Sequence, residues 1–169
     1  MKLFVHVGAG KTGTTAIQSA LHKNMMYFSD YYAVPPSDSD ARIIHHSFAQ
    51  RARLEELAIF LRRASRDAFI TSEIFHTLST TPGGRAHLER MTSIAEDSGF
   101  EVEFIFAIRR QSDWTESALN QWTKNGKINR DPLEEAKRHL KFPLPKQVLY
   151  FRSIATRSVV HLLAYEKES

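Results

Sequence analysis

The chain has 169 residues, of which 42% are hydrophobic, 25% are charged and none is cysteine. This length and composition are typical of one folded domain and exclude a disordered, collagen-like or coiled-coil protein, while the lack of cysteine excludes a disulfide scaffold, a thiolate nucleophile and a cysteine-based zinc site. The 23 basic and 19 acidic residues give a net charge of +4 that is scattered along the chain, which favours a small anionic ligand over a nucleic acid.

The N-terminal apolar stretch, residues 2–7, is too short for a signal peptide and leads directly into a glycine-rich loop. The longest unbroken apolar runs, 57–61 and 104–108, fall far short of the ~20 residues that a membrane-spanning helix needs. We therefore expect a cytoplasmic protein with no membrane span.

The first half of the chain alternates strand and helix patterns. Residues 2–7 predict a short buried strand that stops at Gly8, and apolar residues at helical spacing predict a helix over 14–24. Two prolines followed by Ser-Asp-Ser-Asp predict a loop over 31–40. An amphipathic helix over 54–64 and a second short strand, Ala68–Ser72, follow.

The second half continues the alternation. Pro-Gly-Gly at 82–84 predicts a turn, and a helix through 88–95 is expected to stop at Gly99. Residues 101–108 alternate at first and are then fully apolar, as in a central parallel strand. We further expect a helix that starts near Asp113, capped with Glu116, and ends at 124–126, a helix over 131–140, and a fourth strand over 158–164.

This order of elements predicts an α/β domain with a parallel sheet. In such sheets ligands bind beyond the carboxyl ends of the strands. The sequence therefore brings three polar segments, 8–15, 72–76 and 109–117, to one rim of the sheet.

The segment 8–15, Gly-Ala-Gly-Lys-Thr-Gly-Thr-Thr, joins a strand to a helix, and its glycines, Lys11 and the helix N-terminus suit a bound anion. The nucleoside-triphosphate loop G-x-x-x-x-G-K-[ST] does not fit, because its leading glycine would fall on Val5. The apolar strand over 104–108 also ends in Arg109-Arg110 where a metal-binding carboxylate would be expected. Arg110 is expected to point to the other face.

The segment 6–15, His-Val-Gly-Ala-Gly-Lys-Thr-Gly-Thr-Thr, resembles the phosphosulfate-binding loop of the sulfotransferases, whose core is Lys-[Ser/Thr]-Gly-Thr-Thr after a first strand. The Ala-Ile-Gln-Ser-Ala-Leu that follows resembles the first helix of bacterial members. Arg109 ends a strand and Ser117 follows eight residues later, which is similar to the second element of the family. The resemblance covers 2–24 and 68–127.

The resemblance implies a single domain over 1–169 with a three-layer, P-loop NTPase-like fold: a parallel sheet with flanking helices. It implies a transferase, a sulfotransferase that moves a sulfuryl group from 3′-phosphoadenosine 5′-phosphosulfate (PAPS) to an acceptor hydroxyl or amine, without a metal. A small molecule or, as the bacterial-looking loop favours, a carbohydrate would be the acceptor, and 3′-phosphoadenosine 5′-phosphate (PAP) the product. Because members of the family usually continue further, we expect the usual C-terminal part to be missing.

The resemblance also implies roles for individual residues. Lys11 would stabilise the oxygen that leaves the sulfur, and the residues that hold the 5′-phosphate would be Gly10, Lys11, Thr12, Gly13, Thr14 and Thr15. Arg109 and Ser117 would bind the 3′-phosphate. For the base that takes the acceptor's proton, Glu73 at the end of the second strand is our first choice and His76 the second.

The sequence also allows other roles for these residues and other functions. Glu73 can be a surface carboxylate or a partner of Lys11, and the two tryptophans, Trp114 and Trp122, are expected in the core, with adenine stacking as the alternative. His6 is expected to be buried, and His45 and His46 to point to different faces rather than to bind a metal. A nucleotide kinase or NTPase and a non-catalytic nucleotide-binding domain are the two rival functions.

Overall fold

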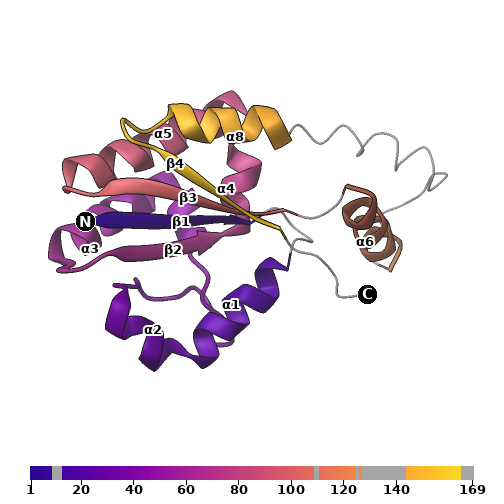
Figure 1. Cartoon of the computed structure of the whole chain (residues 1–169), viewed down its shortest axis with the longest axis horizontal. Helices are drawn as coiled ribbons and strands as arrows, with labels where there is room; N and C mark the ends of the chain where they lie inside the picture. Colours follow the sequence, from indigo (N-terminus) through magenta and orange to yellow (C-terminus); the bar gives the residue numbers. More distant parts are fainter. Residues whose placement is uncertain (9–12, 109–110, 125, 127–143, 165–169) are drawn as a thin grey trace.

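The computed structural model describes residues 1–8, 13–108, 111–124, 126 and 144–164. Its centre is a four-stranded parallel sheet in the order β2-β1-β3-β4 (Figure 1). The strands are β1 (Lys2–Gly8), β2 (Ala68–Ser72), β3 (Glu101–Ile108) and β4 (Val159–Ala164). Each lies within one residue of its predicted position, so the prediction of an α/β domain with a parallel sheet is confirmed.

The part of the chain that the structure describes also contains seven α-helices and two short 3-10 turns, η1 (His46–Ala49) and η2 (Arg51–Arg53). The predicted helices correspond to α1 (Thr14–Lys23), α3 (Leu54–Arg63), α5 (Pro82–Asp97) and α6 (Gln111–Lys124), and three further helices were not predicted: α2 (Met25–Tyr31), α4 (Glu73–Leu78) and α8 (Leu144–Ser153). The helix predicted over 131–140 lies outside the described residues.

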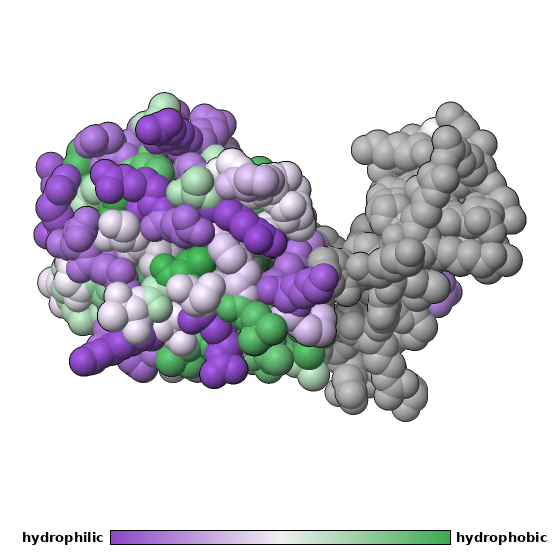
Figure 2. All heavy atoms as spheres, turned by 90° about the horizontal axis from the view of Figure 1, so that it is seen from above, coloured by the Kyte–Doolittle hydropathy of each residue, from purple (hydrophilic) through white to green (hydrophobic). Residues whose placement is uncertain are grey.

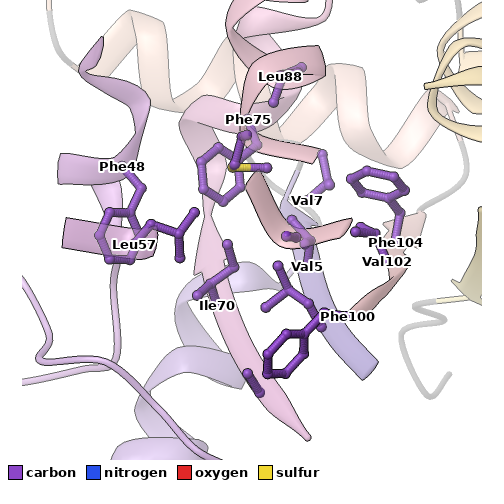
Figure 3. Packing of buried hydrophobic residues seen from close by; sticks show 14 of the residues in the cluster. Val5, Val7, Phe48, Leu57, Ile70, Phe75, Leu88, Phe100, Val102 and Phe104 are labelled. Carbon is purple, nitrogen blue, oxygen red and sulfur yellow. The ribbon is translucent and has the colours of Figure 1, made fainter. Parts of the chain in front are cut away.

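One face of the sheet carries the hydrophobic core. Alternate residues of β1 and β3 face the same side in register, Leu3 with Val102, Val5 with Phe104 and Val7 with Phe106. Figure 3 shows how side chains from the covering helices meet this face. They come from α3, α4, α5 and α8 and include Leu57, Phe75, Leu88 and Phe151, none of which is exposed.

The opposite face of β1 and β2 is covered by α1 and α2. The ring of Phe28 in α2 meets Phe69 of β2 edge-on at 5.2 Å, and Tyr32, just after α2, meets Phe4 of β1 at 5.6 Å. The two helices therefore lie on the other side of the sheet from α3, α4, α5 and α8. The arrangement is a sheet between two helical layers.

The outer edge of β2 is covered by the segment 33–46, which we call the edge segment. Ala33 accepts a hydrogen bond from the N–H of Phe69 at 2.9 Å, and the N–H of His45 donates to the carbonyl of Thr71 at 2.8 Å. Such a cover satisfies main-chain groups that an open sheet edge would leave free. It also carries the chain from one end of β2 to the other, so that residues 42–46 lie at the carboxyl end of the strand.

Helix α5 begins earlier than expected, and the prediction of a turn at 82–84 is wrong. Thr81 is the N-cap, its hydroxyl accepting from the N–H of Gly84 at 3.1 Å, and Pro82 stands at the first helical position. There its missing N–H costs nothing. The helix stops as predicted before Gly99, whose φ is 83°. Helix α6 likewise begins two residues before the expected Asp113.

The surface is mixed in character. Figure 2, which looks onto the molecule from above, shows mainly hydrophilic residues with smaller apolar areas between them. Within the described ranges, none of the helices combines the length and the apolar character that crossing a bilayer would take.

The two glycines at the start of α5 provide a test of this packing. A Cβ on Gly84 would lie only 2.7 Å from the carbonyl carbon of Leu78, whereas one on Gly83 would meet nothing within 4 Å. Gly84→Ala should therefore lower the free energy of unfolding by about 1–3 kcal/mol, the usual cost of overpacking. Gly83→Ala should be neutral or raise it by up to about 1 kcal/mol. Urea unfolding measures both, and equal midpoints would contradict this packing of α4 against α5.

Candidate functional site

The carboxyl ends of three neighbouring strands meet at one rim of the sheet. Val7 of β1 is in register with Ser72 of β2, and Gly8 with Ala107 of β3. The chain passes from β1 to β2 on one side and then to β3 on the other, so the strand order reverses at β1. In open α/β sheets a ligand crevice lies at this switch point.

The junction between β1 and α1 depends on a close contact between two residues of the predicted loop. A Cβ on Gly8 would lie 2.5 Å from the side chain of Thr14, so only glycine leaves room for that side chain. Thr14 is consequently buried, whereas Thr15 is exposed. Gly13 caps the helix with φ 79°, a left-handed conformation that suits glycine. Gly10, Lys11 and Thr12 lie outside the described residues.

The N-terminus of α1 is the positive end of the helix dipole. The helix has no acidic residue in its first turn and no side-chain bond at its N-cap. Arg42 of the edge segment adds a full positive charge there, since its Nη1 donates to Oγ1 of Thr15 at 3.3 Å. The N-terminal N–H groups of a helix and a guanidinium together favour an anion. The described residues of this junction therefore fit a phosphate or sulfate group.

The carboxyl end of β2 contributes a hydroxyl, an imidazole and a carboxylate. The Ser72 hydroxyl caps α4 by accepting from the N–H of Ile74 at 3.2 Å, and it lies 2.7 Å from Nδ1 of His46. The hydroxyl can therefore donate its hydrogen bond to Nδ1 of His46, and the N–H of that ring is then on Nε2. Burial lowers the pKa of His46, while the charge of nearby Glu73 acts in the opposite direction.

The two candidate bases have different surroundings. Glu73 is the first residue of α4, half-buried, and close enough to His46 to influence its titration. His76 lies one turn later, where burial lowers its pKa and the side chain of Gln147 in α8 partly offsets that effect. Gln147 is itself buried. Glu73 thus directly follows Ser72 and lies near His46, whereas His76 lies near Gln147.

The predicted 3′-phosphate partners, Arg109 and Ser117, follow the end of β3. Ser117 is half-buried in α6, which lies beyond the carboxyl ends of the strands (Figure 1). Arg109, its predicted partner, and the neighbouring Arg110 lie outside the described residues, and so do the side chains of Trp114 and Trp122. The proposed 3′-phosphate contacts stay predictions.

Behind the rim, a buried polar network joins four segments through Thr71. Its hydroxyl accepts from Nε2 of Gln18 at 3.2 Å and lies 2.9 Å from Nδ1 of His6, and its N–H donates to Nδ1 of His45 at 3.0 Å. Nε2 of His45 in turn donates to the carbonyl of Pro35 at 3.1 Å. The bond from the N–H of Thr71 requires His45 to be neutral, with an unprotonated Nδ1 and its proton on Nε2.

Two sequence predictions about the histidines are confirmed. His6 is buried as expected, and His45 and His46 do point to different surroundings, one into the network and the other to Ser72. Over the residues that the structure describes, no group of three or more acidic or histidine side chains could hold a metal ion. The sequence did not reveal Arg42 or His46 as rim residues, because no local pattern marks them.

A scan of protein-family models and a search of curated proteins find no match to this chain.

The buried histidines predict loss of stability in mild acid. Burial lowers the pKa of His6 and of His45 to about 4, against about 6.5 in the unfolded chain. The unfolded state therefore binds more protons than the folded state between these values, and the free energy of unfolding falls as the pH drops from 6.5 towards 4. Each histidine should contribute a slope of about 1.4 kcal/mol per pH unit in that window.

Urea unfolding at several pH values measures this slope. His45→Asn keeps an acceptor for the N–H of Thr71 but does not titrate, so the slope should decrease by about 1.4 kcal/mol per pH unit. His22→Gln, at an exposed position of α1, is the matched control. A slope that is the same in His45→Asn and wild type would contradict the neutral buried imidazole.

Proposed function

We propose that this protein is a sulfotransferase that moves a sulfuryl group from PAPS to the hydroxyl or amine of an acceptor, with a carbohydrate as the preferred class. The observation that carries the proposal is the rim itself. The positive N-terminus of α1, with Arg42 at Thr15, lies at the end of β1, and the carboxylate of Glu73 stands at the end of the adjacent strand. The positive N-terminus suits the anionic donor, and the carboxylate can accept the proton of the acceptor.

In this proposal the donor's 5′-phosphate binds at the loop and the first turn of α1, through the backbone from Gly10 to Thr15 and the exposed hydroxyl of Thr15. Thr14 would act through its backbone N–H, since its side chain is buried against Gly8. Arg109 and Ser117 would hold the 3′-phosphate. This last contact would distinguish PAPS from nucleotides without a 3′-phosphate.

The transfer step balances with these residues alone. The acceptor's oxygen or nitrogen forms a bond to sulfur as the bond between sulfur and the bridging oxygen breaks. The electron pair goes to that oxygen on the 5′-phosphate of the departing PAP, where Lys11 would stabilise the developing charge. The acceptor's proton goes to the carboxylate of Glu73.

A nucleotide kinase or NTPase is the second candidate, because Glu73 directly follows β2, the strand next to β1, and a carboxylate there could also serve a nucleotide-bound magnesium ion. Two features of the sequence argue against a kinase or NTPase. Arg109 follows the central strand, and Val5 stands in place of the leading glycine. A domain that binds PAP without transferring sulfate is the third. A cytoplasmic location, suggested by the lack of cysteine, belongs to the same proposal.

Ligand binding and transfer test the function together. Calorimetry should show that the chain binds PAP without magnesium more tightly than ATP with magnesium. Lys11→Ala should fold normally but lose transfer from PAPS by at least ~10²–10³, because the lysine acts on charge that develops in the transition state. Lys23→Ala, in the last turn of α1, is the control and should keep its activity. Tighter binding of magnesium-ATP would favour the kinase, and PAP binding without transfer the non-catalytic domain.

Two single substitutions test which residue is the base. Glu73→Gln keeps the shape and removes the proton acceptor, so nucleotide binding should be normal and turnover should fall by ~10²–10⁴. His76→Ala should lower turnover much less, since His76 lies against Gln147. Full activity of Glu73→Gln together with loss in His76→Ala would reverse the assignment. If both variants are active, the proton goes elsewhere.

A further inference from the structure

We infer that Arg42 is an additional binding residue for the 5′-phosphate of the nucleotide. The inference rests on the proposed function, because it concerns the same site. No feature of the sequence assigns Arg42 a role: it follows a Ser-Asp-Ser-Asp loop, far from the glycine-rich segment. The assignment comes from where the fold brings its guanidinium.

The main chain around Arg42 is held on two sides. Its carbonyl accepts from the Ser37 hydroxyl at 2.8 Å, and the N–H of the next residue, Ile43, donates to the carbonyl of Gln18 in α1 at 3.3 Å. The side chain then reaches Thr15, with 3.3 Å between Nη1 and Oγ1. A group held on both sides in this way loses little freedom when a ligand binds, which favours affinity.

The charge of Arg42 has no counter-ion among the residues that the structure describes. Within the described residues, no carboxylate lies within 4.0 Å of its guanidinium. The one hydrogen bond that this guanidinium makes to the described part of the chain goes to a neutral hydroxyl, so four of its five N–H groups have no partner there. The guanidinium also stands at the positive end of α1, which has no acidic residue in its first turn. Two positive poles at one point are unfavourable unless an anion binds between them.

The contact with Thr15 identifies the part of the ligand. A phosphate that accepts from the Thr15 hydroxyl would lie within a few ångströms of a guanidinium only 3.3 Å from the same oxygen. The planar fork of arginine matches two oxygens of such a group. In the proposed complex the group at this helix N-terminus is the 5′-phosphate, whereas the 3′-phosphate would lie by Arg109 and Ser117. Arg42 should therefore respond to one end of the nucleotide and not to the other.

Two nucleotides that differ only at the 5′ end test this assignment. Wild type and Arg42→Ala are titrated calorimetrically with PAP, which carries both phosphates, and with adenosine 3′-monophosphate, which lacks the 5′-phosphate. The variant should bind PAP about 10–100-fold more weakly, the usual range for a lost charged hydrogen bond, and adenosine 3′-monophosphate within about twofold of wild type. Arg42→Lys should recover part of the loss.

Arg66→Ala is the matched control, because Arg66 donates to the carbonyls of Ser29 and Asp30, at the end of β2 that lies away from the rim. It should bind both nucleotides as wild type does. Unchanged PAP binding in Arg42→Ala overturns the inference, and so does an equal loss for both nucleotides, since Arg42 would then only support the loop. If wild type instead prefers magnesium-ATP and Arg42→Ala weakens that binding, the sulfotransferase proposal fails while the contact to a 5′-phosphate is supported.

Discussion

The rim depends on the way in which Thr71 is bonded on the outer edge of β2. The N–H, the carbonyl and the hydroxyl of this one residue are satisfied by His45, Gln18 and His6, which come from the edge segment, α1 and β1. Thr71 is fully buried, so each of these bonds replaces one with water, and an unmade bond would cost about 1–3 kcal/mol. The edge segment is therefore fixed at the point where it reaches the carboxyl end of the sheet.

This anchoring accounts for the positions of Arg42 and His46. His45 lies between them in sequence, and both of its ring nitrogens are bonded. The short segment that carries Arg42 and His46 is therefore held in place. One reaches Thr15 at the start of α1 and the other reaches Ser72 at the end of β2. A buried neutral network thus supports a charged surface site, which keeps the cost of burying polar groups low.

Much of the fold could be read from the sequence. The four strands show as apolar runs of the right length, and the end of α5 is marked by a glycine with positive φ. The sequence predicts a later start for α5, because Pro-Gly-Gly favours a turn, although Thr81 before it is a good N-cap. Helix α4 is only six residues long, too short to show helical periodicity.

The site was harder to read than the fold for a physical reason. Thr14, Thr15 and Glu73 stand next to strand ends, and parallel strands bring such residues together without further information. Arg42 and His46 meet Thr15 and Ser72 only because a loop with no periodic pattern is bonded to a strand 26 residues further on. Contacts of that kind depend on tertiary hydrogen bonds, which leave no local signature.

The contrast between Glu73 and His76 shows how the fold separates residues that the sequence treats alike. They are three residues apart on one helix, so they point in similar directions around its axis. Glu73, however, is at the first position of α4, directly after the strand end, while His76 is one turn deeper, where Gln147 of α8 covers it. A carboxylate at the strand end can meet a ligand held at the neighbouring helix N-terminus. An imidazole in the second position would first have to leave its contact with α8, and its burial already disfavours the protonated state that a base must reach.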